Sequence, residues 1–278
     1  MITIELRKLF LRPRMWVSVL LLCALPAVVA VFLATTHITP PPGQGAAFLS
    51  AVERNGSLFP AAALALVLPI FLPIAVTTFA GDAVAGEAVQ GTLRYLLIRP
   101  VSRIRLLVAK MIAIAVFIVV SIAFVVGTSY LIGKGLFGGG AGQPAAVGQP
   151  GGVTSLSGSA LTPFDLSLRL LAAIGYIVVC MLGVGVIALF FSTVTTSGLG
   201  ASLGALAILI TSEILATLDA ANPVKPYLPT NYWLSWIDFF RDPVFWHNID
   251  RGLLAQGAYL VVFFTAAWAN LSTKDITS

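Results

Sequence analysis

The chain has 278 residues, of which 58% are hydrophobic and only 10% are charged. An average soluble domain carries about 25% charged residues, so the composition excludes an ordinary soluble protein and indicates an integral membrane protein. The net charge of +5 does not indicate nucleic-acid binding, because no basic stripe with interleaved aromatic residues occurs. Cys23 and Cys180 both lie in apolar segments, where buried thiols are expected.

The first 14 residues combine apolar residues at helical spacing with basic ones. The apolar residues are Ile2, Leu6, Leu9 and Phe10, and the basic ones are Arg7, Lys8, Arg12 and Arg14. This pattern predicts a short interfacial helix that lies on the cytoplasmic face before the first span.

Six apolar segments follow, each near the roughly 20 residues that a helix needs to cross a bilayer. They cover about 15–35, 60–80, 106–132, 170–191, 198–216 and 253–271. We therefore expect an all-α integral membrane protein, with residues 1–278 forming one domain. An even number of spans places both termini on one side, and the basic N-terminus indicates that this side is the cytoplasm.

Two prolines, Pro69 and Pro73, lie inside the second apolar segment. Proline lacks a backbone N–H, so a kink is expected there. Two interpretations remain open. The kink shapes a transport pathway, or it is an ordinary kink whose freed backbone groups bond to neighbouring helices.

Between the second and third segments the chain concentrates charge and helical pattern. Five basic residues, Arg94, Arg99, Arg103, Arg105 and Lys110, follow Asp82 and Glu87. Lipid does not accommodate this charge density, so the loop is expected in the cytoplasm. Over about 87–99 an apolar face opposes a polar one, which predicts an amphipathic helix. It is either a plain connecting helix or a helix that docks onto a partner, and its context favours docking.

Two later segments are expected on the outside. Residues 133–163 are rich in Gly, Pro, Gln, Ser and Ala, which predicts a flexible loop. Residues 217–252 contain Pro223, Pro226 and Pro229, followed by the aromatic stretch YWLSWIDFFRDPVFWH. Such rings suit a membrane boundary, so short interfacial or re-entrant helices are expected between spans 5 and 6.

Glu213 is the one acid well inside an apolar span. Two interpretations remain open: the carboxylate lines a transport pathway, or it reaches outer-leaflet water or pairs with a neighbouring helix, and the second is favoured near the interface. We list Glu213 and Trp236, with Pro69 and Pro73, as candidate residues of a pathway or outer gate. No catalytic constellation, metal-ligand pattern or nucleotide-binding motif occurs in the sequence, so the chain is not expected to be an enzyme.

The loop resembles the cytoplasmic segment of ABC-2 type permeases, the membrane subunits of ATP-driven exporters. The shared pattern is an acidic residue, GTL, a leucine pair, PVSR, and a basic residue that opens the next span. In this chain the matching residues are Glu87, Gly91-Thr92-Leu93, Leu96-Leu97, Pro100-Val101-Ser102-Arg103 and Lys110. The order of elements matches over nearly the whole chain, while the long 133–163 loop departs from the pattern.

The resemblance implies a permease subunit in a bacterial inner (plasma) membrane. Its expected partners are two ATP-binding subunits, which hold ATP and Mg, and a second permease subunit, identical or homologous. No cofactor is expected on this chain. The docking residues carried over are Glu87, Gly91, Thr92, Leu93, Arg94, Leu97, Arg99, Pro100 and Arg103. The alternative is an ATP-independent channel or secondary carrier, for which intramembrane charge would be the main sign.

Overall fold

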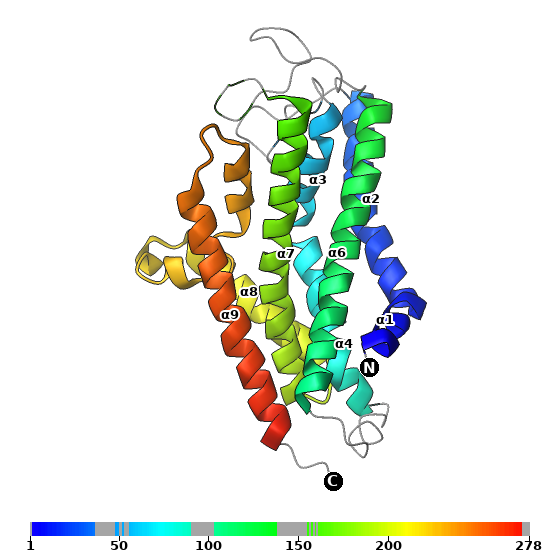
Figure 1. The fold of residues 1–278 in the computed structure, drawn as a ribbon, viewed down its shortest axis with the longest axis vertical. Coiled ribbons are helices and arrows are strands. Elements are labelled where there is room, and N and C mark those ends of the chain that lie inside the picture. The colour runs from blue at the N-terminus through cyan, green and yellow to red at the C-terminus, as the bar shows by residue number, and fades with distance from the viewer. Residues whose placement is uncertain are drawn as a thin grey trace.

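The computed structural model of the chain is a bundle of long helices, and the residues it describes contain no β-strand (Figure 1). It describes residues 2–36, 48–49, 52, 56–89, 103–137, 155, 157, 159 and 161–273. The expectation of an all-helical protein is confirmed for this part of the chain.

The N-terminal region forms an elbow of two helices. α1 spans Ile2–Leu11 and α2 spans Pro13–Thr36, with Arg12 between them. Proline is favoured in the first turn of a helix because its missing N–H has no partner to lose there. α1 turns Glu5 and Leu9 into the bundle and leaves Ile4 and Leu11 exposed. The predicted separate N-terminal helix is therefore present, and one of its buried residues is an acid.

The second apolar segment is broken. The 3₁₀ helix η2 (Gly56–Leu58) leads into α3 (Phe59–Val67), and α4 (Phe71–Val89) follows at a bend of 58°. Pro69 lies in the break, as expected for a kink. Pro73 lies in the first turn of α4, where its missing N–H is tolerated. α4 also runs nine residues beyond the predicted end of this span at residue 80.

Three long helices come next in the chain. α6 spans Arg103–Leu136, α7 spans Pro163–Val194 and α8 spans Gly198–Thr217. The hydroxyls of Thr162 and Ser197 cap α7 and α8 by accepting bonds from Asp165 N and Gly200 N. Because α6 runs to Leu136, the first residues of the predicted 133–163 loop are helical.

Three 3₁₀ helices connect α8 to the last helix. They are η3 (Asp219–Ala221), η4 (Lys225–Tyr227) and η5 (Trp233–Phe240), and α9 (Trp246–Thr273) follows. In Figure 1, η5 runs back along the upper part of α9, and α9 then returns to the end of the bundle where α1 lies. Five rings of the aromatic stretch are buried against the protein, namely Tyr232, Trp233, Trp236, Phe239 and Phe240.

Five helices, α2, α6, α7, α8 and α9, are long and apolar enough to cross a membrane, and the bent pair α3–α4 passes the same test if it is counted as one span. This is the makeup of a multi-pass membrane protein. Lipid tails are as apolar as leucine, so packing and polar contacts, more than burial from water, hold such helices together.

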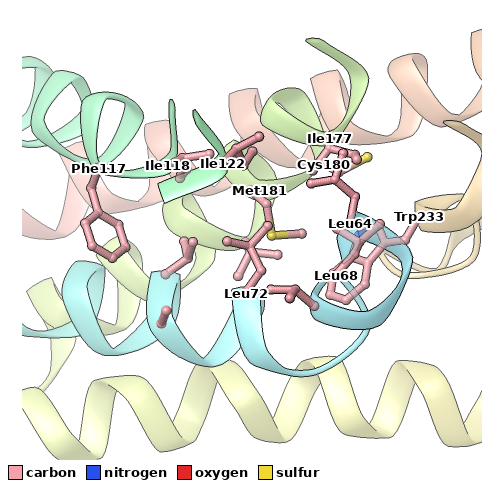
Figure 2. Packing of buried hydrophobic residues seen from close by; sticks show 14 of the residues in the cluster. Leu64, Leu68, Leu72, Phe117, Ile118, Ile122, Ile177, Cys180, Met181 and Trp233 are labelled. Carbon is pink, nitrogen blue, oxygen red and sulfur yellow. The ribbon is translucent and has the colours of Figure 1, made fainter. Parts of the chain in front are cut away.

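α7 packs against α4, α6, α8, α9 and η5. Figure 2 shows its residues Ile177, Cys180 and Met181 beside Leu64, Leu68 and Leu72, which come from both sides of the α3–α4 break. Leu68 and Met181 are fully buried. The break is therefore packed on its inner side, and this core fixes where the two half-helices meet.

Candidate functional site

Four charged residues meet at the end of the bundle where α1, α4 and α6 come together. Lys110 Nζ of α6 lies 2.6 Å from Glu87 Oε1 and 2.8 Å from Glu5 Oε2. Lys8 Nζ lies 3.0 Å from Glu87 Oε1 and 3.5 Å from Glu5 Oε1. We call these residues, Glu5, Lys8, Glu87 and Lys110, the inner ion cluster. Its two carboxylates and two ammonium groups balance in charge.

The inner ion cluster is largely removed from solvent. Glu87 is 2% exposed and Lys110 is 4% exposed. Moving a charge out of water costs several kcal/mol, and close partners offset this cost only while all of them remain in place. The cluster therefore ties α1, α4 and α6 together in one arrangement.

Lys8 is the most accessible member of the cluster. Burial acts to lower the pKa of its amine, but the contacts with Glu87 and Glu5 outweigh burial and raise this pKa above the ordinary value. Lys8 is therefore positively charged at neutral pH and holds α1 against the end of α4.

Further contacts hold the last turns of α4. Ser192 Oγ of α7 accepts hydrogen bonds from Val84 N at 3.0 Å and from Ala85 N at 2.9 Å. On another side, Asp82 Oδ2 lies 3.7 Å from Arg12 Nη1 and 3.6 Å from Arg14 Nη1. These two ion pairs are long and partly solvated, so they contribute less than the inner ion cluster does.

A second polar network lies toward the other end of the bundle, where α8 gives way to η3–η5. Tyr176 Oη donates to Tyr232 O at 2.7 Å, and Gln256 Nε2 donates to Pro229 O at 2.6 Å. Ser212 Oγ and Thr230 Oγ1 are 2.7 Å apart. Carbonyls of irregular backbone need such partners when water is excluded, so side chains of α7, α8 and α9 hold this connection in place.

The depth of this network follows from helix geometry. Tyr176 is 13 residues from Pro163 and Gln256 is 10 residues from Trp246. At 1.5 Å per residue, the 229–232 segment lies about 15–20 Å inward from those ends of α7 and α9. The connection therefore enters the bundle before η5 turns back outward.

Close approach of α7 and α9 at this network depends on Gly252. A Cβ added there would overlap the Tyr176 hydroxyl and lie 2.9 Å from the Cβ of Tyr232. A glycine at this position lets the tyrosine reach the backbone of the connection.

A model of the family described as "Protein of unknown function (DUF2705)" matches residues 24–277. The chain belongs to the DUF2705 family. No curated protein matches the sequence. The family assignment covers nearly the whole chain and leaves its activity to be inferred from the residues themselves.

In this DUF2705 protein, the predicted docking residues are only partly described. Glu87 is buried in the inner ion cluster and turns toward α1 and α6. Arg103 opens α6 and its guanidinium donates to the carbonyls of Leu271, at 2.5 Å, and Ser272, at 2.6 Å, near the end of α9. The other predicted residues lie outside the described part of the chain, namely Gly91, Thr92, Leu93, Arg94, Leu97, Arg99 and Pro100.

The four candidate residues of an outer gate occupy different surroundings. Glu213 is exposed on α8 and Pro69 is exposed in the α3–α4 break, whereas Pro73 is buried. Trp236 is 0% exposed and packs against Phe48 and Phe240. Among the described contacts none joins Glu213 to Trp236.

Sequence reasoning missed Glu5 and Lys8 as partners of Glu87 and Lys110. The available signal was an acid within an otherwise basic N-terminal helix, together with a lysine inside the third apolar segment. Part of the predicted 133–163 loop also has defined contacts, because Ser159 Oγ donates to Asp242 Oδ2 at 2.7 Å. In the described residues no group of three or more His, Cys, Asp or Glu side chains is arranged to hold a metal.

Proposed function

We propose that this DUF2705 protein is the permease subunit of an ABC-2 type exporter, which moves an unidentified cargo outward using ATP hydrolysed by a separate subunit. The observation that carries the proposal is an ion pair between the helices that flank residues 90–102. Glu87 on α4 and Lys110 on α6 are the first and last residues of the family-like pattern, and Lys110 Nζ lies 2.6 Å from Glu87 Oε1. This ion pair fixes the two ends of the proposed docking segment to each other.

The proposed coupling follows from these contacts. A displacement of the 90–102 segment would move the end of α4 and the start of α6 together, because Glu87 and Lys110 join these two helices. The contacts of α4 with α1, through Glu5 and Lys8, and with α7, through Ser192, give this end of α4 several rigid neighbours. Displacement of a docked ATPase would then be passed into the bundle as movement of helices, with little bending of the connection.

For the topology we propose six spans, with α3 and α4 together forming the second. Both termini and the inner ion cluster would face the cytoplasm of a bacterial cell, and the protein would reside in the inner (plasma) membrane. The basic residues of α1, the α1–α2 elbow and the 94–110 region support this orientation. The η3–η5 connection would lie in and above the outer leaflet.

The proposed assembly contains two ATP-binding subunits, which hold ATP and Mg, and a second permease subunit. An ATP-independent channel or secondary carrier is the alternative. The observation that favours it is the broken α3–α4 helix, since discontinuous helices form the binding sites of many carriers. The two proposals differ in whether the chain works with an ATPase.

The test is purification of the tagged chain from its native membrane, with identification of bound subunits and measurement of ATP hydrolysis in liposomes. We expect an ATP-binding subunit in the complex. Reversal of both Arg94 and Arg99 to Glu is expected to lower ATP hydrolysis about tenfold, because like charges at a docking surface weaken association.

The control is Arg251→Glu, a single charge reversal near the start of α9 at the opposite end of the bundle, which is expected to leave the rate unchanged. An isolated chain without any ATP-binding subunit, or a wild-type rate in the double reversal, would contradict the proposed function and favour the carrier.

A further inference from the structure

The exposed carboxylate of Glu213 lies on a helix that is otherwise apolar around it. Ile210 and Ile214, which flank it on α8, are 58% and 56% exposed. An ionisable group on a spanning helix is expensive in lipid and normally faces a partner or a water-filled space. Among the described residues no ion pair to Glu213 is found, so its carboxylate is open to a positively charged partner from elsewhere.

The packing of α4 against α8 sets the level of Glu213. Ser202 Oγ donates to Thr77 O at 3.1 Å, and a Cβ added to Gly81 would lie 3.0 Å from Gly198 O. Residue numbers therefore rise along α8 as they fall along α4, so the helices are antiparallel. From the Thr77–Ser202 contact, Glu213 lies about 16 Å and the break at 68–70 about 10–13 Å toward the outer end, at 1.5 Å per residue.

Glu213 and the α3–α4 break therefore lie at nearly the same level, within about one helical turn. Ile70, in the break, is 59% exposed, and Pro69 beside it is exposed as well. α3 leans away from the axis of α4 by 58° and packs on α6 and α2. The break at the start of α4 and the carboxylate on α8 thus lie at nearly the same level of two helices that pack together, and Pro69, Ile70 and Glu213 are all exposed.

The chemistry of the break matches that of Glu213. Pro69 and Pro73 remove two N–H groups from the place where one half-helix ends and the next begins. The break is consequently richer in carbonyl acceptors than in amide donors. A carbonyl-rich break and a carboxylate both favour a positively charged group that donates hydrogen bonds, while Ile70, Phe71, Ile210 and Ile214 offer apolar contact.

We infer that Glu213 and the α3–α4 break form a site for an amphipathic organic cation, a protonated amine with an apolar body. The inference deepens the proposed function, on which it rests for the role of such a cation as cargo. Glu213 neutralises the ammonium group, and carbonyls of the break accept hydrogen bonds from its remaining N–H groups. Ile70, Ile210 and Ile214 cover the apolar body.

The test uses the chain in lipid nanodiscs without any ATPase, so that its outcome is separate from that of the coupling experiment. Binding of rhodamine 6G, a lipophilic cation with N–H groups, is followed by fluorescence polarisation. Dodecylamine and dodecanol serve as charged and uncharged competitors of equal length. We expect competition by dodecylamine and none by dodecanol.

Glu213→Gln is expected to raise the Kd for rhodamine 6G about tenfold, since one charge-assisted contact is lost. Glu213→Asp is expected to stay within about threefold of the wild type, because it keeps the charge. The matched control is Asp219→Asn, which removes an exposed acid just beyond α8 and leaves Kd unchanged.

Three results would overturn the site: no binding by the wild type, equal competition by dodecanol, or the same Kd change in Asp219→Asn as in Glu213→Gln. If the cation binds as expected and no ATP-binding subunit exists, the site stands and serves a carrier, whereas the ABC-2 proposal fails.

Discussion

Replacing Lys110 by methionine is expected to lower the free energy of unfolding by about 3–5 kcal/mol, the usual effect of removing one partner from a buried ion pair. Methionine keeps most of the length of the lysine side chain, so packing changes little. The loss of charge leaves the carboxylates of Glu5 and Glu87 in a buried site with only Lys8 beside them. The destabilisation is measured as a fall in the apparent Tm of the purified protein in detergent, relative to the wild type.

Two variants make this prediction specific. Asp82→Asn removes an acid whose ion pairs are 3.6 and 3.7 Å long and partly solvated, so a loss of less than about 1 kcal/mol is expected. The double variant Glu87→Gln with Lys110→Met is expected to lose less free energy of unfolding than the sum of the two single losses. Each single variant leaves the charge of the other residue buried without this partner, and the double variant removes both charges. Additive losses would show that Glu87 and Lys110 do not act as a pair.

Replacing Gly252 by alanine is expected to lower the free energy of unfolding by about 2–4 kcal/mol, from overpacking and the loss of a buried hydrogen bond. The added methyl group would occupy the position of the Tyr176 hydroxyl, which donates to Tyr232 O. Either α9 must then move away from α7, or the side chain of Tyr176 must rotate out of its present position. Either change releases the 229–232 segment, which is measured as a lower apparent Tm and faster proteolysis of the η3–η5 connection.

Gly257 supplies the control on the same helix. A Cβ added there meets nothing within 4 Å. Gly257→Ala is expected to leave stability unchanged or to raise it slightly, since alanine favours helix by up to about 1 kcal/mol. Equal effects of the two substitutions would show that close packing at Gly252 is not what holds the connection.

The long apolar segments made the helices predictable, because about 20 apolar residues in a row have few other stable arrangements. The end of the second segment was not predictable in this way. Asp82 and Glu87 suggested that the span ends by residue 80, yet α4 continues to Val89. The helix keeps both acids because basic groups from α1, the α1–α2 elbow and α6 reach them, and such distant pairs have no local sequence signal.

The aromatic stretch shows a similar limit. Trp and Phe residues in a short polar-flanked segment predict a membrane boundary as readily as a packed core. Phe245 and Trp246 are exposed, whereas Trp236 and Phe240 are buried beside Phe48. The backbone that precedes these rings is held by hydrogen bonds from Tyr176 and Gln256, which join residues 56 and 27 positions apart, respectively.

The central claim is that residues 90–102 dock onto a cytoplasmic ATP-binding subunit. Photo-crosslinking in intact cells tests this most directly, with a photoreactive amino acid at Arg94 or Arg99 and, as control, at Asn222 in the exposed connection between α8 and α9. Adducts are identified by mass spectrometry. We expect a crosslink to an ATP-binding subunit from positions 94 and 99 and none from position 222. A crosslink to that subunit from position 222, or its absence from both 94 and 99, would contradict the account.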